Sequence, residues 1–126
     1  MTFSIVARCA ETGMFGMAIS SSSPAVAARC AFAKAGVGAV ATQNITNPAL
    51  GPIVLSQLAA GETAQKALAK AIEDEGYPDY RQVLAINKAG QTAIHSGGNA
   101  LGVWTSAHGK DCAAGGNLLA LSLIHI

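Results

Sequence analysis

The residues best placed to carry out chemistry lie at the start of the chain, where Thr2 follows Met1. Because threonine is small, we expect methionine aminopeptidase to remove Met1 and to leave Thr2 with a free α-amine. The hydroxyl of such a residue can attack an electrophile while its own amine, which titrates close to neutral pH, accepts the proton. Thr2 is therefore the candidate nucleophile, and the alternative is an ordinary threonine at the start of a strand.

A run of hydroxyls, Ser20–Ser23, supplies a second set of candidates, from which we select Ser20 and Ser22 as catalytic. A serine hydroxyl could polarise the nucleophile or donate a hydrogen bond to an oxyanion. The alternative for each serine is a strand end and turn in which the hydroxyl bonds to its own backbone.

Amide and charged side chains complete the candidate site. Asn117 follows two glycines, which permit close backbone approach, so it could stabilise an oxyanion; the alternative is a β-bulge. Gln43 and Asn44 could donate hydrogen bonds to a substrate, or instead anchor the loop that follows them. Arg29 could bind a substrate carboxylate, and His95 could act as acid or base, although both residue types are often structural.

The composition limits the classes of partner. A chain of 126 residues is long enough for one domain with a hydrophobic core. Only 12% of its residues are charged and the net charge is +1, which gives no electrostatic reason to bind nucleic acid or an anionic membrane. We therefore expect a small-molecule substrate. The abundance of Ala and Gly favours tight packing and a possible homo-oligomer.

The cysteines indicate a reducing compartment. Cys9, Cys30 and Cys112 are odd in number, widely separated and without a histidine at ligand spacing, so we expect free thiols, no metal site and no cofactor. The N-terminus lacks the pattern of a secretory signal, and no apolar run approaches about 20 residues. We expect a soluble protein of the cytoplasm.

Strands must position Thr2 and the serines. Residues Thr2–Ala10 and Met14–Ser22 alternate in polarity around the turn Glu11–Gly13, which predicts a β-hairpin. The two faces of the first strand carry Phe3, Ile5, Ala7 and Cys9 on one side and Ser4, Val6 and Arg8 on the other. Because the strands are antiparallel, the end of the second lies near the start of the first. The serine run is therefore predicted to lie close to Thr2.

The remaining pattern predicts helices between two groups of strands. The expected elements are a helix or loop at Val26–Ala35, a strand at Gly36–Gln43, helices that follow Pro48 and Thr63 and stop at Gly61 and Gly76, a hairpin of Tyr80–Ile86 with Gln91–Ser96, and a last strand at Cys112–Leu119. Runs of strands on both sides of a helical pair argue for an α+β fold with helices packed on an antiparallel sheet.

Several blocks of the sequence resemble the bacterial family known as domain of unknown function 1028. The matching blocks are Met1–Arg8, Ser20–Cys30, Ala35–Asn44, Tyr80–Gln82 and, with one extra or altered glycine, Ala113–Ala120. The resemblance spans residues 1–120 and implies the αββα sandwich of the N-terminal-nucleophile hydrolases. Members of that superfamily typically hydrolyse amides, so the resemblance implies amide hydrolysis, and we expect the substrate to be a small cytosolic amide. A catalytically silent sandwich that binds a metabolite or serves as an oligomeric subunit is the alternative.

The end of the sequence does not fit this resemblance. The family's chains run well beyond this length, so we expect the C-terminal part of the domain to be missing. Residues 121–126 are similar to the translated mosaic end of a transposon used to prepare sequencing libraries. We interpret residues 1–120 as the N-terminal portion of the domain and residues 121–126 as a non-native tail.

Overall fold

The computed structural model of the chain describes residues 1–119. Its elements in order are β1 (Thr2–Arg8), β2 (Phe15–Ser21), α1 (Ala27–Cys30), β3 (Ala31–Lys34), β4 (Gly38–Asn44), α2 (Leu50–Ala59), α3 (Ala64–Glu73), a 3₁₀ turn (Pro78–Tyr80), β5 (Arg81–Asn87), β6 (Thr92–Ser96), β7 (Val103–Gly109) and β8 (Cys112–Leu119). The predicted non-native tail, residues 121–126, lies outside the described residues.

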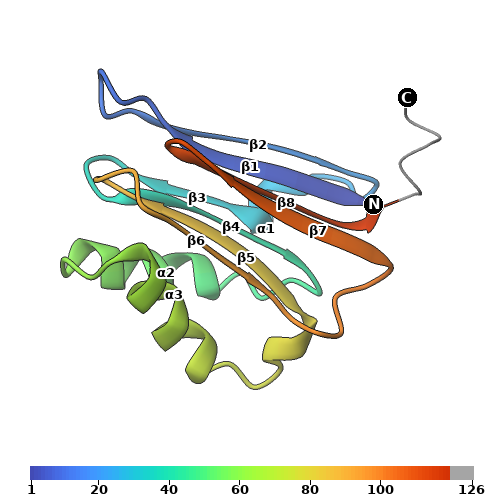
Figure 1. Cartoon of the computed structure of the whole chain (residues 1–126). Coiled ribbons are helices and arrows are strands. Elements are labelled where there is room, and N and C mark those ends of the chain that lie inside the picture. The colour runs from blue at the N-terminus through green and yellow to red at the C-terminus, as the bar shows by residue number, and fades with distance from the viewer. Residues whose placement is uncertain (120–126) are drawn as a thin grey trace.

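Two antiparallel sheets stack face to face, and helices cover one of them (Figure 1). Sheet A has the strand order β2-β1-β8-β7, and sheet B has the order β3-β4-β5-β6. Helices α2 and α3 pack on the face of sheet B that points away from sheet A (Figure 1). Over residues 1–119 the fold is therefore mixed α/β, in three layers, with the outer face of sheet A uncovered.

The alternation in β1 decides which side chains face the interior. Ser4 and Val6 are buried between the sheets, whereas Phe3 and Ile5 remain 49% and 38% exposed on the outer face of sheet A. Val6 packs in the inter-sheet core, whose other buried members are Ala39, Ala41, Leu84, Ile86 and Ala113. The larger apolar side chains of this strand thus point away from the core of the described residues.

A second core joins sheet B to the helices. Helix α3 begins at Thr63, whose side chain accepts a hydrogen bond from the Lys66 N–H, the N-terminal cap expected for threonine. The buried members of this core include Val40, Leu50, Val54, Leu58, Leu68 and Val83. Because β5 is covered by sheet A on one face and by helices on the other, all seven of its residues are buried.

Most of the predicted elements are confirmed, and two strands are added. Val26–Ala35, predicted as helix or loop, contains the short helix α1 followed by strand β3. Strand β7 was not predicted, and every one of its residues is exposed. In residues 1–119 no helix combines the length and the apolar character needed to cross a membrane.

Candidate functional site

Thr2 lies at one end of the sandwich with its side chain on the inner face of sheet A. Its strand neighbours in register are Ser21 of β2 and Asn117 of β8, so the three side chains share that face. The Thr2 and Ser21 hydroxyl oxygens are 2.8 Å apart in a hydrogen bond. The topology therefore brings the serine run to Thr2, as the hairpin predicted.

The two serines selected from the sequence have other surroundings. Ser20 pairs with Phe3, so its exposed side chain lies on the outer face of sheet A, away from the Thr2 hydroxyl. The Ser22 hydroxyl accepts a hydrogen bond of 3.2 Å from the Met1 α-amine, and its backbone N–H donates to the Met1 carbonyl. Ser21, the residue between them, contacts Thr2 because side chains alternate along a strand.

Below Thr2, a chain of neutral polar side chains connects the two sheets. The Ser4 hydroxyl donates to Gln43 Oε1 at 2.7 Å, and Gln43 Nε2 donates to Gln82 Oε1 at 2.7 Å and to the Gly115 carbonyl at 3.1 Å. Asn117 Nδ2 donates to the same Gln82 oxygen at 3.1 Å. Each of these four side chains is at least nine-tenths buried, so their mutual hydrogen bonds replace those that water would otherwise make.

Ser4 and Gln82 are the members of this network that were not predicted as site residues, and Gln82 makes the larger number of contacts. Its Nε2 group donates to the Ser96 hydroxyl at 3.1 Å and to the backbone carbonyls of Gly116 and Thr105 at 3.3 and 3.4 Å. Gln82 falls in the matching block Tyr80–Gln82, but that resemblance assigns it no chemical role. The signal available was a polar residue placed in the most buried strand, where an amide needs partners.

Asn117 lies on a β-bulge, the alternative considered for it from sequence. Two steps along β7, Val103 to Thr105, correspond to three steps along β8, Gly116 to Leu119. Leu118 within this interval has a φ of 51°, a left-handed conformation that is unusual for a bulky residue. A bulge changes the direction in which nearby side chains point. The presence of the bulge is therefore compatible with a role for Asn117 as an oxyanion donor.

Asn44 anchors loops at the same end of sheet B. Its Nδ2 donates to the Tyr80 carbonyl at 2.6 Å, and its Oδ1 accepts from the Leu101 N–H at 3.2 Å. The Leu101 carbonyl in turn accepts from the Leu118 N–H at 2.8 Å. Asn44 is thus linked to the bulge through Leu101, whereas Gln43 belongs to the inter-sheet network.

Arg29 and His95 are not brought to Thr2 by any contact within residues 1–119. Arg29 Nη1 donates to the Pro24 carbonyl at 3.2 Å, which ties α1 to the loop after β2. His95 pairs with Val83 and therefore lies on the helix-facing side of sheet B, where its Nε2 bonds to the Pro78 carbonyl at 2.9 Å.

A buried ion pair fixes the loops behind the site. Arg81 Nη2 donates to Glu75 Oε1 at 2.9 Å, and Asn47 Nδ2 donates to Glu75 Oε2 at 2.6 Å. Burial alone would raise the pKa of the Glu75 carboxyl, but hydrogen bonds from Arg81, Asn47 and the Tyr77 N–H outweigh it and hold this pKa below its ordinary value. Arg81 Nη1 also donates to the Ile45 carbonyl at 2.6 Å, which holds the segment after β4 in place.

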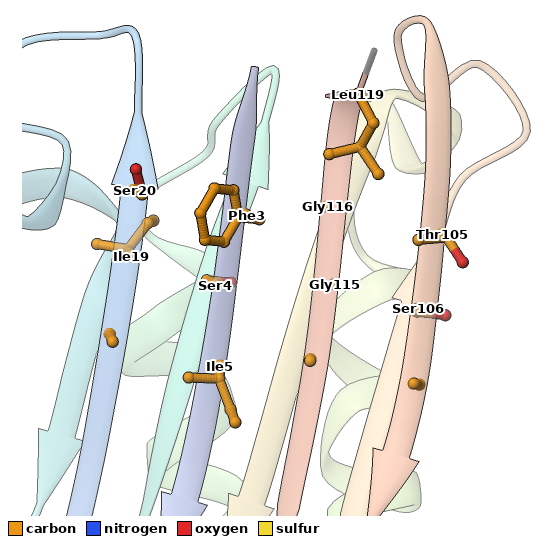
Figure 2. A pocket seen from close by; sticks show the side chains of 13 residues that line it. Phe3, Ser4, Ile5, Ile19, Ser20, Thr105, Ser106, Gly115, Gly116 and Leu119 are labelled. Atoms are coloured by element: carbon orange, nitrogen blue, oxygen red, sulfur yellow. The ribbon is translucent and has the colours of Figure 1, made fainter. Parts of the chain in front are cut away.

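The outer face of sheet A carries an apolar groove. Figure 2 shows Phe3 and Ile5 in front of β1, with Ser4 behind the strand. The groove has a volume of about 380 Å³, and its floor consists largely of small residues of β2, β7 and β8, among them Ala18, Ala107, Ala114 and Gly116. It lies on the opposite face of the sheet from Thr2, so the groove and the polar network are separate features.

Two comparisons relate the chain to known proteins, and a third finds no match. The profile of the Family of unknown function (DUF1028) matches residues 2–124. The crystal structure of protein SPO2555 from Silicibacter pomeroyi, described with the same family, is similar with a TM-score of 0.91 and 27% sequence identity. That similarity covers 98% of this chain and 56% of the solved protein, so the chain spans little more than half of that relative. No curated protein matches the sequence.

Proposed function

This chain belongs to the family of unknown function DUF1028, and on that premise we propose that it is an N-terminal-nucleophile amidohydrolase acting on a small amide. The observation that carries the proposal is the Thr2 hydroxyl, 2.8 Å from the Ser21 hydroxyl on the inner face of sheet A and paired in register with Asn117. A nucleophile held at the first position of a strand has the rigid placement that catalysis requires.

The proposed reaction uses Thr2 alone for proton transfer. Once Met1 is removed, Thr2 Oγ1 attacks the amide carbon, a C–O bond forms, the carbonyl π electrons move onto oxygen, and the hydroxyl proton passes to the α-amine. The C–N bond then breaks, and the α-ammonium returns its proton to the leaving nitrogen. Water attacks the resulting ester, gives a proton to the α-amine, and releases the carboxylic acid as Thr2 regains its hydroxyl. One water is consumed for each amide hydrolysed.

Neighbouring neutral groups have distinct roles in this proposal. Ser21 orients the Thr2 hydroxyl, and Asn117 donates a hydrogen bond to the oxyanion that forms in the transition state. Because the partners of Thr2 within residues 1–119 are hydroxyl and amide groups, the α-amine is the base in this mechanism. The reaction requires neither a metal ion nor a cofactor.

The fold proposal extends the three observed layers to four. The uncovered face of sheet A is apolar, and the solved relative has additional chain beyond the matched region. In a soluble protein, a large apolar sheet face is normally buried against another layer of the fold or against a binding partner. We propose that further polypeptide of the full-length protein packs on this face as a helical layer and completes an αββα sandwich.

The proposed setting is the bacterial cytoplasm. Cys9, Cys30 and Cys112 are free thiols, and a thiol as exposed as Cys9 suits a reducing compartment. The small net charge supports a small-molecule substrate, with neither nucleic acid nor membrane as a partner, and the abundance of Ala and Gly supports a homo-oligomer.

A catalytically silent sandwich is the second candidate. The observation that favours it is the apolar groove on the outer face of sheet A, whose volume of about 380 Å³ suits a small metabolite. In this case the buried amide network serves only to join the two sheets, and Thr2 is an ordinary residue of the first strand.

Substitutions of Thr2 in the full-length protein separate the two candidates. We expect Thr2→Ser to retain, and Thr2→Ala to abolish, the hydrolysis of any amide that the wild type cleaves in a panel of small acyl amides. Far-UV circular dichroism should show all three proteins folded. Hydrolysis that persists in Thr2→Ala would exclude Thr2 as the nucleophile, and no cleavage of any amide by the wild type would favour the silent sandwich.

A further inference from the structure

Backbone carbonyls determine which groups of the inter-sheet network donate hydrogen bonds and which accept them. Gly116 O and Thr105 O can only accept hydrogen bonds, so the group of Gln82 that faces them must be its Nε2. Gln82 Oε1 therefore points toward the two donors, Gln43 Nε2 and Asn117 Nδ2. The orientation of the Gln82 amide follows from its surroundings and does not depend on Asn117.

That polarity dictates how Asn117 is held. Because Gln82 presents an acceptor, the Asn117 amide must turn its NH₂ group toward the interior, at 3.1 Å from the Gln82 oxygen. The Nδ2 group has two N–H bonds, and Gln82 accepts one of them. Within residues 1–119 the other N–H has no hydrogen-bond partner, and we assign it to a ligand beside Thr2, the register partner of Asn117 in β1.

Gln82 also holds the backbone on which Asn117 sits. Its Nε2 bonds to the Gly116 carbonyl, one residue before Asn117, and to Thr105 on β7, directly opposite Gly116. The bulge follows at once, with Leu118 at a φ of 51°. A strained backbone conformation persists only where the surroundings determine it, and such sites cluster where function requires a fixed geometry.

From these contacts we propose that Gln82 is a positioning residue, which fixes the amide orientation of Asn117 and the adjoining bulge so that Asn117 can stabilise the oxyanion formed at Thr2. The inference rests on the proposed function. Gln82 does not touch the substrate; it acts through Asn117, with the hydrogen bonds on its far side holding its own amide in place.

The test uses acylation of Thr2 in the full-length protein by a β-lactone probe. Thr2 Oγ1 attacks the lactone carbonyl, the ring C–O bond breaks, and the released alkoxide takes the proton from the α-ammonium to become a hydroxyl. The acylation rate constant is measured by intact-mass spectrometry for the wild type, Gln82→Met, Asn117→Ala and the double variant. Methionine has a similar length and volume and removes every hydrogen bond of the amide.

A positioning role predicts non-additive effects. Gln82→Met should slow acylation at least tenfold in the wild-type background, because one oxyanion donor is then misplaced, and less than twofold when Asn117 is already alanine. Ser4→Ala is the matched control: it removes a buried hydrogen bond of the same network, between Ser4 and Gln43, without touching Gln82 or Asn117. We expect it to change the rate less than twofold.

Each remaining outcome overturns a distinct claim. An equal slowing by Gln82→Met in both backgrounds, or an equal effect of Ser4→Ala, would show that the network only stabilises the fold. Acylation at the wild-type rate in Gln82→Met would refute the inference while leaving the proposed function intact. A wild type that is not acylated at Thr2 would instead refute the proposed function.

A second variant keeps the test decisive if Gln82→Met fails to fold. Gln82→Glu has the same shape, and its protonated form supplies one donor and one acceptor in place of the amide, whereas its carboxylate cannot donate to Gly116 and Thr105. Its acylation rate relative to the wild type should recover as the pH falls. A ratio that stays far below one at every pH contradicts the positioning role.

Discussion

At the scale of single residues, adjacent serines in β2 have opposite environments around the candidate nucleophile. Ser21 contacts the Thr2 hydroxyl at 2.8 Å, while Ser20 lies on the outer face of sheet A beside Phe3. The antiparallel hairpin predicted that the serine run approaches Thr2. It could not predict which serine makes contact, because a shift of one residue in register exchanges the two faces.

The two serines make a matched pair of substitutions. We predict that Ser21→Ala slows acylation of Thr2 by about two- to thirteenfold, the equivalent of one net hydrogen bond of about 0.5–1.5 kcal/mol. Ser20→Ala should alter the rate less than twofold. A time course of labelling by the β-lactone probe would give both rate constants. If Ser20→Ala slows acylation more than Ser21→Ala does, the nucleophile lies on the outer face of sheet A and is not Thr2.

Gln82 shows why part of the site was not predictable from single residues. Its role depends on sheet B facing sheet A, so that one glutamine reaches Gly116, Thr105 and Asn117 on two other strands. Asn117 was recognised because glycines precede it, which is a local signal. A contact made across two layers leaves no local pattern in the sequence.

At the scale of elements, close approach of β4 to its neighbours depends on a glycine. A Cβ at Gly38 would overlap the Ile86 carbonyl oxygen and come within 2.8 Å of Leu58 Cδ1. The backbone of β5 cannot move aside without breaking its ladder with β4. A Cβ added at Gly16 in β2 would have no heavy atom within 4 Å beyond its chain neighbours, so this glycine is the matched control.

We predict that Gly38→Ala lowers the free energy of unfolding by about 1–3 kcal/mol, as overpacking does. Gly16→Ala should leave this free energy within about 1 kcal/mol of the wild type or raise it slightly. Urea denaturation followed by circular dichroism would measure the two variants. Equal stability of both would mean that β4 and β5 are further apart than the structure has them.

The loop anchor at Glu75 gives a pH dependence with a defined sign. The pKa of this carboxyl is lowered in the folded state, so its stabilisation is present above the unfolded pKa of about 4.3 and is lost as the pH falls through the folded value. We predict that Glu75→Gln costs about 3–5 kcal/mol at pH 7, because Arg81 is left buried without its charge partner. The difference from the wild type should shrink below about pH 4.

Denaturation curves at pH 7 and at pH 3 would measure this difference. The Glu62–Lys70 pair is a suitable control, because it is accessible to solvent and its loss in Glu62→Gln should leave the free energy of unfolding nearly unchanged at both pH values. A Glu75→Gln penalty that stays constant across the two pH values would contradict the role assigned to the carboxylate.

At the scale of the whole molecule, the mixture of helices and antiparallel strands was predictable from the residues, whereas the division of the strands into two sheets was not. Helical spacing and strand alternation identified two helices and six strands, whereas β7, exposed throughout, shows no regular alternation between buried and exposed positions. The pattern in β1 contains two faces, and periodicity alone could not tell that Ser4 and Val6 face the core while Phe3 and Ile5 face outward.

The proposed fourth layer makes a prediction for that outer face. In the full-length protein, Phe3→Asp should lower the free energy of unfolding by more than about 3 kcal/mol, because the side chain is then buried under the added layer. Met14→Asp, in the exposed turn between β1 and β2, should change it by no more than about 0.5 kcal/mol. Equal tolerance of the two substitutions would show that sheet A faces solvent.

The measurement that tests the central claim most directly is peptide mapping of the full-length protein by mass spectrometry after reaction with a β-lactone probe. We predict an N-terminal peptide that begins at Thr2, without Met1, and that carries a single acyl group on the Thr2 side chain. Retention of Met1 would remove the free α-amine, and an adduct confined to any other residue would place the nucleophile elsewhere. Either result would contradict the assignment of Thr2.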